Sequence, residues 1–126
     1  MKKLLALVLV LVCVFSLAGC EDKNAAKAEA AALAAITAHY DTVCTEMVEV
    51  EKFKYSAHDA PEITTVEKVD KNQYLVTGTI TGSNAMHVVE KNWIAEWSLT
   101  MVKDENGAFV VASDPLPDYG GFIYTN

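Results

Sequence analysis

Residues 21–60 contain neither glycine nor proline, and this segment constrains the fold more than any other. Its first half is rich in alanine, the residue with the highest helix propensity, and Asn24 can cap a helix that begins there. Larger apolar residues then recur at steps of three and four, which places them on one helical face: they are Leu33, Ile36, Tyr40, Val43, Met47 and Val50. The pattern predicts one amphipathic helix over residues 24–50 that packs on a sheet, although coiled coils share this spacing. Its alanine-rich first turns offer little to bury and would serve as a semi-rigid stalk.

After Phe53 the apolar pattern changes to the period of two that is typical of β-strands. Four segments are predicted to be strands: residues 61–69, 73–81, 86–103 and 108–112. Residues typical of turns separate them: these are Asp70-Lys71-Asn72, Thr81-Gly82-Ser83-Asn84 and Asn106-Gly107. One face of the long third segment is apolar apart from Lys91, so it should meet the helix: it comprises Val89, Lys91, Trp93, Ala95, Trp97, Leu99 and Met101.

The helix and the long strand together predict the core, in which four helical residues should contact four strand residues: Ile36, Tyr40, Val43 and Met47 against Trp93, Ala95, Trp97 and Leu99. Residues 113–126 hold two of the three prolines and a glycine pair, so they are predicted to form a loop or an extension along a sheet edge. Part of this tail should pack because it carries large apolar residues: Tyr119, Phe122, Ile123 and Tyr124.

The predicted fold class is α+β, with one long N-terminal amphipathic helix packed on a four-stranded antiparallel meander. This order of elements resembles the cystatin-like and NTF2-like folds, in which a curved sheet wraps a helix. The resemblance rests on element order over residues 24–112, and it implies no functional residues.

The first 20 residues have the layout of a secretory signal: Lys2 and Lys3 precede an apolar run from residue 4 to residue 18. That run is shorter than the roughly 20 residues needed to cross a bilayer, which disfavours a membrane span. The run ends in Leu17-Ala18-Gly19-Cys20, which resembles the lipobox of bacterial lipoproteins. The resemblance implies cleavage between Gly19 and Cys20, a diacylglycerol on the Cys20 sulfur, and usually a fatty acid such as palmitate on the new amino group. The alternative is an ordinary cleavable signal with a chance cysteine.

The resemblance to a lipobox implies three parts of the chain: a removed signal (1–19), a lipidated tether (20–24) and a single α+β domain (25–126) that ends in the tail 113–126. In Gram-negative lipoproteins an Asp directly after the lipidated Cys favours retention in the inner membrane. Here Glu21 holds that position and Asp22 follows it, which departs from the rule. The departure leaves both membranes open, and an outer-membrane location facing the periplasm is favoured over the inner membrane if the host cell has two membranes.

Composition disfavours several classes of partner. All ten basic residues are lysines, and loss of Lys2 and Lys3 with the signal changes the formal charge from −7 to −9. Nucleic acids and anionic lipid surfaces are bound through basic patches, so neither is an expected partner. After lipidation of Cys20 and loss of Cys13, Cys44 is the remaining thiol, which leaves no intramolecular disulfide.

No catalytic or metal-binding motif stands out, so neither an enzyme nor a cofactor is predicted. The three histidines His39, His58 and His87 have no metal-ligand spacing to one another or to a cysteine. His39 and Cys44 lie five residues apart, a poor geometry on a helix for a thiolate–imidazole pair. His58 and the adjacent Asp59 are interpreted as a polar loop before a proline, rather than as part of a metal site.

Two functions from different classes follow. The first is a membrane-anchored, non-catalytic accessory or interaction module of the cell envelope, with a protein partner. The second is a small apolar-ligand binding or sensing domain, with a pocket between the helix and the sheet that is lined by Tyr40, Lys91, Trp93 and Trp97. Tryptophans on one strand face are more often core residues, so a cavity of about 300 Å³ or more would be needed to favour the second function.

Overall fold

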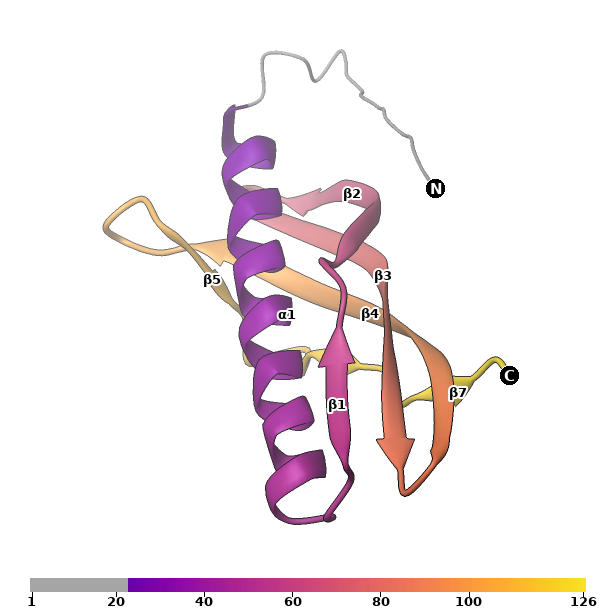
Figure 1. Ribbon diagram of the computed structural model, residues 1–126. Helices are drawn as coiled ribbons and strands as arrows, with labels where there is room; N and C mark the ends of the chain where they lie inside the picture. The colour runs from indigo at the N-terminus through magenta and orange to yellow at the C-terminus, as the bar shows by residue number, and fades with distance from the viewer. Residues whose placement is uncertain (1–22) are drawn as a thin grey trace.

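The computed structural model describes residues 23–126, in which one helix packs against a curled antiparallel sheet (Figure 1). Within these residues the helix α1 (Lys23–Glu49) comes first, close to the predicted range, and seven strands follow it: β1 (Tyr55–His58), β2 (Glu62–Asp70), β3 (Gln73–Met86), β4 (Val89–Lys103), β5 (Phe109–Val111), β6 (Asp118–Tyr119) and β7 (Ile123–Tyr124). The predicted α+β class is confirmed.

The predicted meander of four strands describes only part of the observed sheet. Each edge of the sheet consists of several short strands laid end to end, where the prediction had one strand. β1 and β2 follow one another along β3, and β5, β6 and β7 follow one another along the far edge of β4. Pro61 lies in the gap between β1 and β2, and Pro115 and Pro117 lie between β5 and β6. Proline has no N–H to donate, so these residues mark the places where an edge strand stops. The tail follows a sheet edge, as predicted.

The turn predicted at residues 81–84 is wrong. β3 continues through it to Met86, and the chain reverses at His87 and Val88, where His87 has a φ of 57°. Gly82 was interpreted as a turn glycine, but it lies inside the strand and pairs with Trp93 of β4. A Cβ atom on Gly82 would stand 2.3 Å from the Trp93 Cζ2 atom, so this glycine makes room for an indole ring.

The inward face predicted for the long strand is confirmed from Trp93 onwards. Its five residues are at most 2% exposed: Trp93, Ala95, Trp97, Leu99 and Met101. Tyr40 of α1 stacks on Trp93 with ring centroids 5.9 Å apart. From the tail, Phe122 stacks on the same indole at 4.2 Å, so the tail completes the core.

The alanine-rich start of α1 is part of the core, and its interpretation as a stalk is wrong. Ala28 and Ala32 are fully buried, and they continue a stripe with a step of four: Ala28, Ala32, Ile36, Tyr40 and Cys44. A side chain as small as alanine lets a helix backbone approach a sheet closely, so the absence of bulk is what this surface requires. Val50, predicted on the buried face, lies beyond α1 and is 67% exposed.

Candidate functional site

The predicted lipidation, cleavage and sorting residues, Gly19, Cys20, Glu21 and Asp22, lie outside the described residues. Between residues 23 and 126, the chain has no helix with the length and apolar character needed to cross a bilayer.

The structure does not bring the four predicted pocket residues around one cavity. Tyr40, Trp93 and Trp97 are buried side chains of the core, and the Tyr40 hydroxyl donates to the main-chain oxygen of Gly120 at 2.6 Å. Lys91 is exposed, and its Nζ atom donates to the main-chain oxygen of Asn126 at 2.8 Å. It lines a different hollow, at the end of the β3–β4 hairpin.

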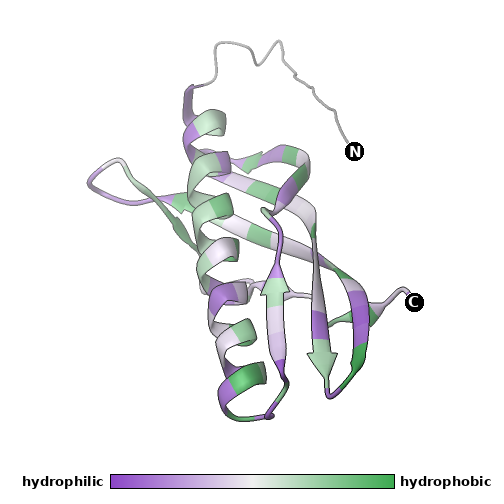
Figure 2. Ribbon diagram, viewed as in Figure 1, coloured by the Kyte–Doolittle hydropathy of each residue, from purple (hydrophilic) through white to green (hydrophobic). Residues whose placement is uncertain are grey.

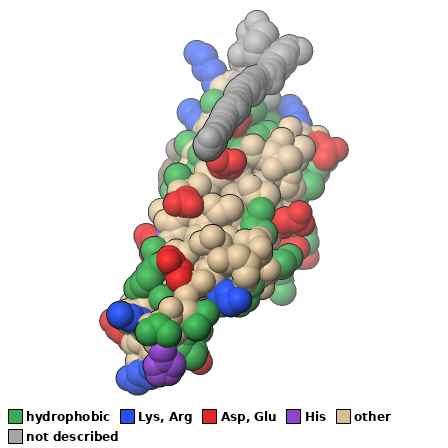
Figure 3. All heavy atoms as spheres, turned by 45° about the vertical axis from the view of Figure 1, so that its right-hand side comes forward, with side chains coloured by type: hydrophobic (Ala, Val, Ile, Leu, Met, Phe, Trp, Pro, Cys, Tyr) green, Lys and Arg blue, Asp and Glu red, His purple; other side chains and the backbone are tan. Residues whose placement is uncertain are grey.

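Exposed apolar side chains gather at one end of the molecule, which we call the distal tip: Val48, Val50, Tyr55, Met86, Val88 and Val89. Figure 2 shows green, hydrophobic bands among hydrophilic ones on the last turn of α1 and on the β3–β4 hairpin at this end, which is opposite the start of α1. Figure 3 shows hydrophobic side chains together with lysines there. Val88, at the hairpin turn, is 95% exposed, and its neighbours Met86 and Val89 are also exposed; a contiguous apolar patch of this kind is typical of an interaction surface.

A hollow of ≈ 350 Å³ lies beside the distal tip. Its walls are mainly apolar and come from the loop after α1, the β3–β4 hairpin and the tail: they include Phe53, Met86, Val89 and Tyr124. Asn84 is buried at its base, where Asn84 Nδ2 donates to the Tyr124 hydroxyl at 3.0 Å.

A second, larger hollow of ≈ 530 Å³ lies along the contact between the C-terminal half of α1 and β1, and we call it the α1–β1 groove. Four of its lining residues bring charge or apolar surface into it: Asp41, Val48, Glu49 and His58. The groove exists because α1 and β1 are joined by a short loop that holds them side by side, and Lys52 adopts a φ of 65° in that loop.

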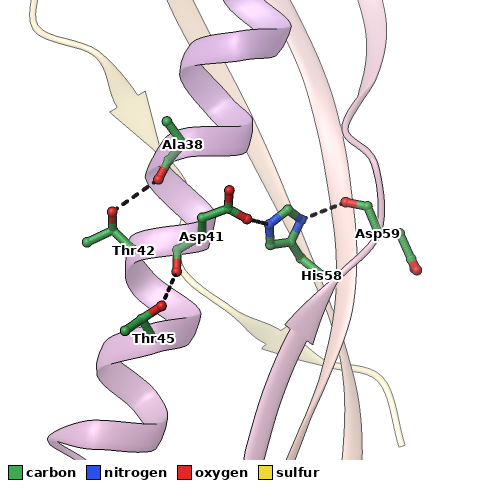
Figure 4. Close-up of polar contacts among 6 residues, drawn as sticks. All are labelled: Ala38, Asp41, Thr42, Thr45, His58 and Asp59. Carbon is green, nitrogen blue, oxygen red and sulfur yellow. Dashed lines mark hydrogen bonds and ion pairs between the residues drawn. The ribbon is translucent and has the colours of Figure 1, made fainter.

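A histidine–carboxylate contact spans the groove (Figure 4). His58 Nε2 lies 2.6 Å from Asp41 Oδ1, and His58 Nδ1 lies 2.8 Å from the main-chain oxygen of Asp59. Both partners are acceptors, so both ring nitrogens donate only when the imidazole is protonated. Burial lowers the pKa of His58, but the Asp59 carbonyl and the Asp41 carboxylate together outweigh burial, and the pKa is raised above 6.5.

His39, on another side of α1, behaves in the opposite way. Its ring stacks on Tyr119 of β6 with centroids 3.9 Å apart, which ties the tail to the helix. Burial lowers the pKa of His39 and the carboxylate of Glu46 offsets only part of that effect. The neutral form of His39 is therefore the one that the fold favours.

These two histidines predict opposite pH dependences of stability. Because the pKa of folded His58 is raised, its stabilisation is complete below pH 6.5 and is lost as the pH rises through the folded pKa. His58→Gln should therefore be less stable than the wild type by about 1 kcal/mol at about pH 5, with the difference shrinking towards about pH 8.5. The effect is no larger because Asp41 is 65% exposed and solvent screens the pair.

The matched control is His39→Gln. The pKa of folded His39 is lowered, so protonation disfavours the fold and this variant should gain stability relative to the wild type as the pH falls below 6.5. Urea unfolding of both variants across pH measures the two slopes. A His58→Gln deficit that grows at alkaline pH would contradict the assignment.

The structure disfavours a nucleophilic role for Cys44. The thiol is buried; burial raises its pKa and Asp41 raises it further, while a hydrogen bond with Ser56 acts in the opposite direction. A thiol held in the protonated form is a weak nucleophile. Both nitrogens of His58 already face oxygen acceptors, and His39 is stacked on Tyr119, so neither imidazole is free to act as its base.

Within residues 23–126 no group of histidine, cysteine or acidic side chains is arranged to hold a metal ion. No protein-family model, no curated protein and no solved structure matches the chain. The features that sequence reasoning missed are β1, the groove beside it and the Asp41–His58 contact. A weak signal for β1 existed, since apolar and polar residues alternate in Tyr-Ser-Ala-His, but four residues are too few for a reliable period.

Proposed function

We propose that this chain is a bacterial lipoprotein, anchored by lipid on Cys20, that acts without catalysis as an interaction module of the cell envelope. The observation that carries the proposal is the position of the distal tip. Exposed apolar residues lie at the end of the molecule opposite the start of α1, where the chain arrives from Cys20 (Figure 1). A helix of 27 residues is about 40 Å long, so the tip would be held well away from the membrane.

Two finer assignments belong to the same proposal. The first is an outer-membrane location facing the periplasm in a host with two membranes, because Glu21 occupies the position where Asp would favour retention in the inner membrane. The second is membership of the cystatin-like or NTF2-like group of folds, which the packing of a curled sheet on one long helix supports.

The test is Cys20→Ser in the native host. This variant should lose membrane attachment, because each buried CH₂ of an acyl chain contributes about 0.8 kcal/mol and two or three chains together hold a protein firmly. Membrane fractionation and mass spectrometry of the mature N-terminus measure the result. Cys13→Ser is the matched control and should remain attached, since Cys13 would be removed with the signal.

The partner is tested in the same strains with a photo-crosslinking residue placed at Val88 of the distal tip or, as a control, at Glu67 of β2. A discrete crosslinked species should form from position 88 and not from position 67, and it should weaken when Cys20→Ser releases the protein. A Cys20→Ser protein that stays attached to the membrane would contradict lipid anchoring through Cys20. Equal crosslinking from both positions would contradict partner binding at the distal tip.

The hollow beside the distal tip favours a second candidate, the binding of a small apolar ligand. It has a suitable size and mainly apolar walls. Saturable binding of an apolar fluorescent probe, lost in Met86→Asp, would support this function over a protein partner.

A further inference from the structure

We propose that the α1–β1 groove binds an extended, basic segment of a partner protein, which adds to the sheet as a strand beside β1. This inference rests on the proposed interaction function and specifies the chemistry of the partner. It stands on three observations: an unpaired strand edge, a groove that runs along it, and the charge of the walls.

The unpaired edge follows from the topology. β1 stands at one end of the strand order β1-β3-β4-β5, so within residues 23–126 a strand occupies only its β3 side. Asp59 N donates to Thr81 O at 2.8 Å, which fixes the residues that face β3. Main-chain groups alternate in direction along an antiparallel strand, so the N–H and C=O groups of Ser56 and His58 point away from β3. An edge of this kind is a template for another strand.

Proteins commonly protect such an edge, and β2 shows how. It carries charged residues along its length, and its register shifts at two places, which disfavours pairing with another chain. β1 has neither of these two devices, since its sequence is Tyr-Ser-Ala-His and its register with β3 is regular, although α1 packs against it. What lies beside β1 is the α1–β1 groove, whose volume of ≈ 530 Å³ is in the range of ordinary ligand sites.

The groove favours a basic occupant. Asp41 and Glu49 of α1 line it, and His58, which among its lining residues in the described chain can carry a positive charge, is paired with Asp41. Asp59 directly follows β1, and the chain as a whole is acidic, with a formal net charge of −7. The buried groups next to His58 are uncharged: the Tyr40 ring lies 6.5 Å from it, and Cys44 is a thiol.

One end of the groove is apolar and continuous with the distal tip. Val48 lines the groove and is also 38% exposed. A bound segment would therefore place an apolar side chain against Val48 and a lysine or arginine between Asp41 and Glu49. Main-chain bonds to β1 would supply affinity and these two side chains would supply specificity, as in other cases of strand addition. An acidic peptide or an anionic membrane surface would be repelled by the same carboxylates.

The experiment uses the mature lipidated protein in detergent micelles and the blocked peptide acetyl-Val-Lys-Val-Lys-Val-Lys-amide as the probe. The peptide should bind to the wild type, weaken with salt, and slow the exchange of the Ser56 and His58 amide protons. The same peptide with N-methyl groups on alternate residues should bind at least tenfold more weakly, because it cannot pair as a strand. The Glu analogue should not bind.

Two matched pairs of variants test whether the peptide binds in the α1–β1 groove. Thr45→Trp fills the groove, whereas Thr42→Trp does not face it; both threonines are exposed and each donates to the carbonyl four residues earlier. Glu49→Lys reverses a charge in the groove, and Glu51→Lys reverses one outside it. Thr45→Trp and Glu49→Lys should weaken binding at least tenfold, and the two controls should bind as the wild type does.

Equal binding to Thr45→Trp and the wild type, equal binding of the N-methylated peptide, or no binding of the basic peptide at millimolar concentration would each overturn the inference. The crosslink from Val88 does not depend on the groove. Its presence without peptide binding would remove this inference alone, and its absence would remove the proposed function.

Discussion

Trp97→Ala is expected to lower the free energy of unfolding by about 3–5 kcal/mol, which is a large part of the 5–15 kcal/mol that a domain typically has. The indole of Trp97 is 2% exposed and belongs to the single cluster of buried side chains that joins α1 to the sheet. Truncation leaves a cavity there, because the ring lies over Gly78 of β3 and that residue has no side chain to fill the space.

Glu96→Ala is the matched control for Trp97→Ala and should change stability by no more than about 0.5 kcal/mol. Glu96 is the next residue on the same strand, but its side chain is exposed on the opposite face. Its main-chain oxygen, which accepts from Gly120 N, is retained in the variant. Urea unfolding of both proteins gives the comparison, and a larger loss for Glu96→Ala than for Trp97→Ala would contradict the burial described above.

Trp97→Phe separates the ring from its polar group. In the described part of the chain the Trp97 Nε1–H has no hydrogen-bond acceptor, and a buried donor without an acceptor costs about 1–3 kcal/mol. Phenylalanine removes that donor and keeps much of the ring, so Trp97→Phe should lose far less stability than Trp97→Ala.

Gly78→Ala is expected to destabilise the protein by at least about 1–3 kcal/mol, although it adds one methyl group. A Cβ atom at this position would stand 1.9 Å from the Glu62 main-chain oxygen and 2.5 Å from the Trp97 Cζ2 atom. Rotation of the Trp97 side chain would relieve the contact with the ring, but the Glu62 oxygen belongs to the paired strand β2, so the sheet itself would have to shift.

Gly121→Ala is the control for Gly78→Ala. A Cβ at position 121 would meet no atom within 4 Å. The substitution should therefore be neutral, or stabilising by about 0.4–1 kcal/mol because alanine reduces the conformational entropy of the unfolded chain. Gly82→Ala should resemble Gly78→Ala, because its Cβ would lie 2.3 Å from both the Ala57 oxygen and the Trp93 ring. Thermal or urea unfolding tests the set, and a stable Gly78→Ala protein would contradict the close contact of ring and glycine.

The sequence predicted the elements that are long enough to show several repeats of their apolar period. The helix at residues 24–50 and the inward face of the long strand follow from spacing alone, and both agree with the structure apart from their ends. Spacing did not predict the burial of Ala28 and Ala32. A hydrophobic pattern is read from large apolar residues, whereas close helix–sheet packing requires small side chains.

Gly82 was misread for a different reason. Glycine serves both in turns and where another group approaches the backbone closely, and local sequence does not distinguish the two. A longer-range signal was present: Gly78 and Gly82 are four residues apart, as are Trp93 and Trp97, and an antiparallel register aligns both pairs at once. The Asp41–His58 contact had no such signal, because it joins two elements through a loop and depends on tertiary packing.

The placement of the distal tip at the far end of α1 also determines how the molecule would respond to mechanical force. A pull between Lys23 and the β3–β4 hairpin runs roughly parallel to the α1 axis (Figure 1). Such a pull slides the helix along the sheet in shear, so the contacts of Ala28, Ile36 and Tyr40 must break together. A pull across the axis would instead peel them apart one turn at a time. Forced unfolding is governed by the unfolding rate. Because a longitudinal pull must break these contacts at the same time, unfolding under longitudinal tension should be far slower than under transverse tension.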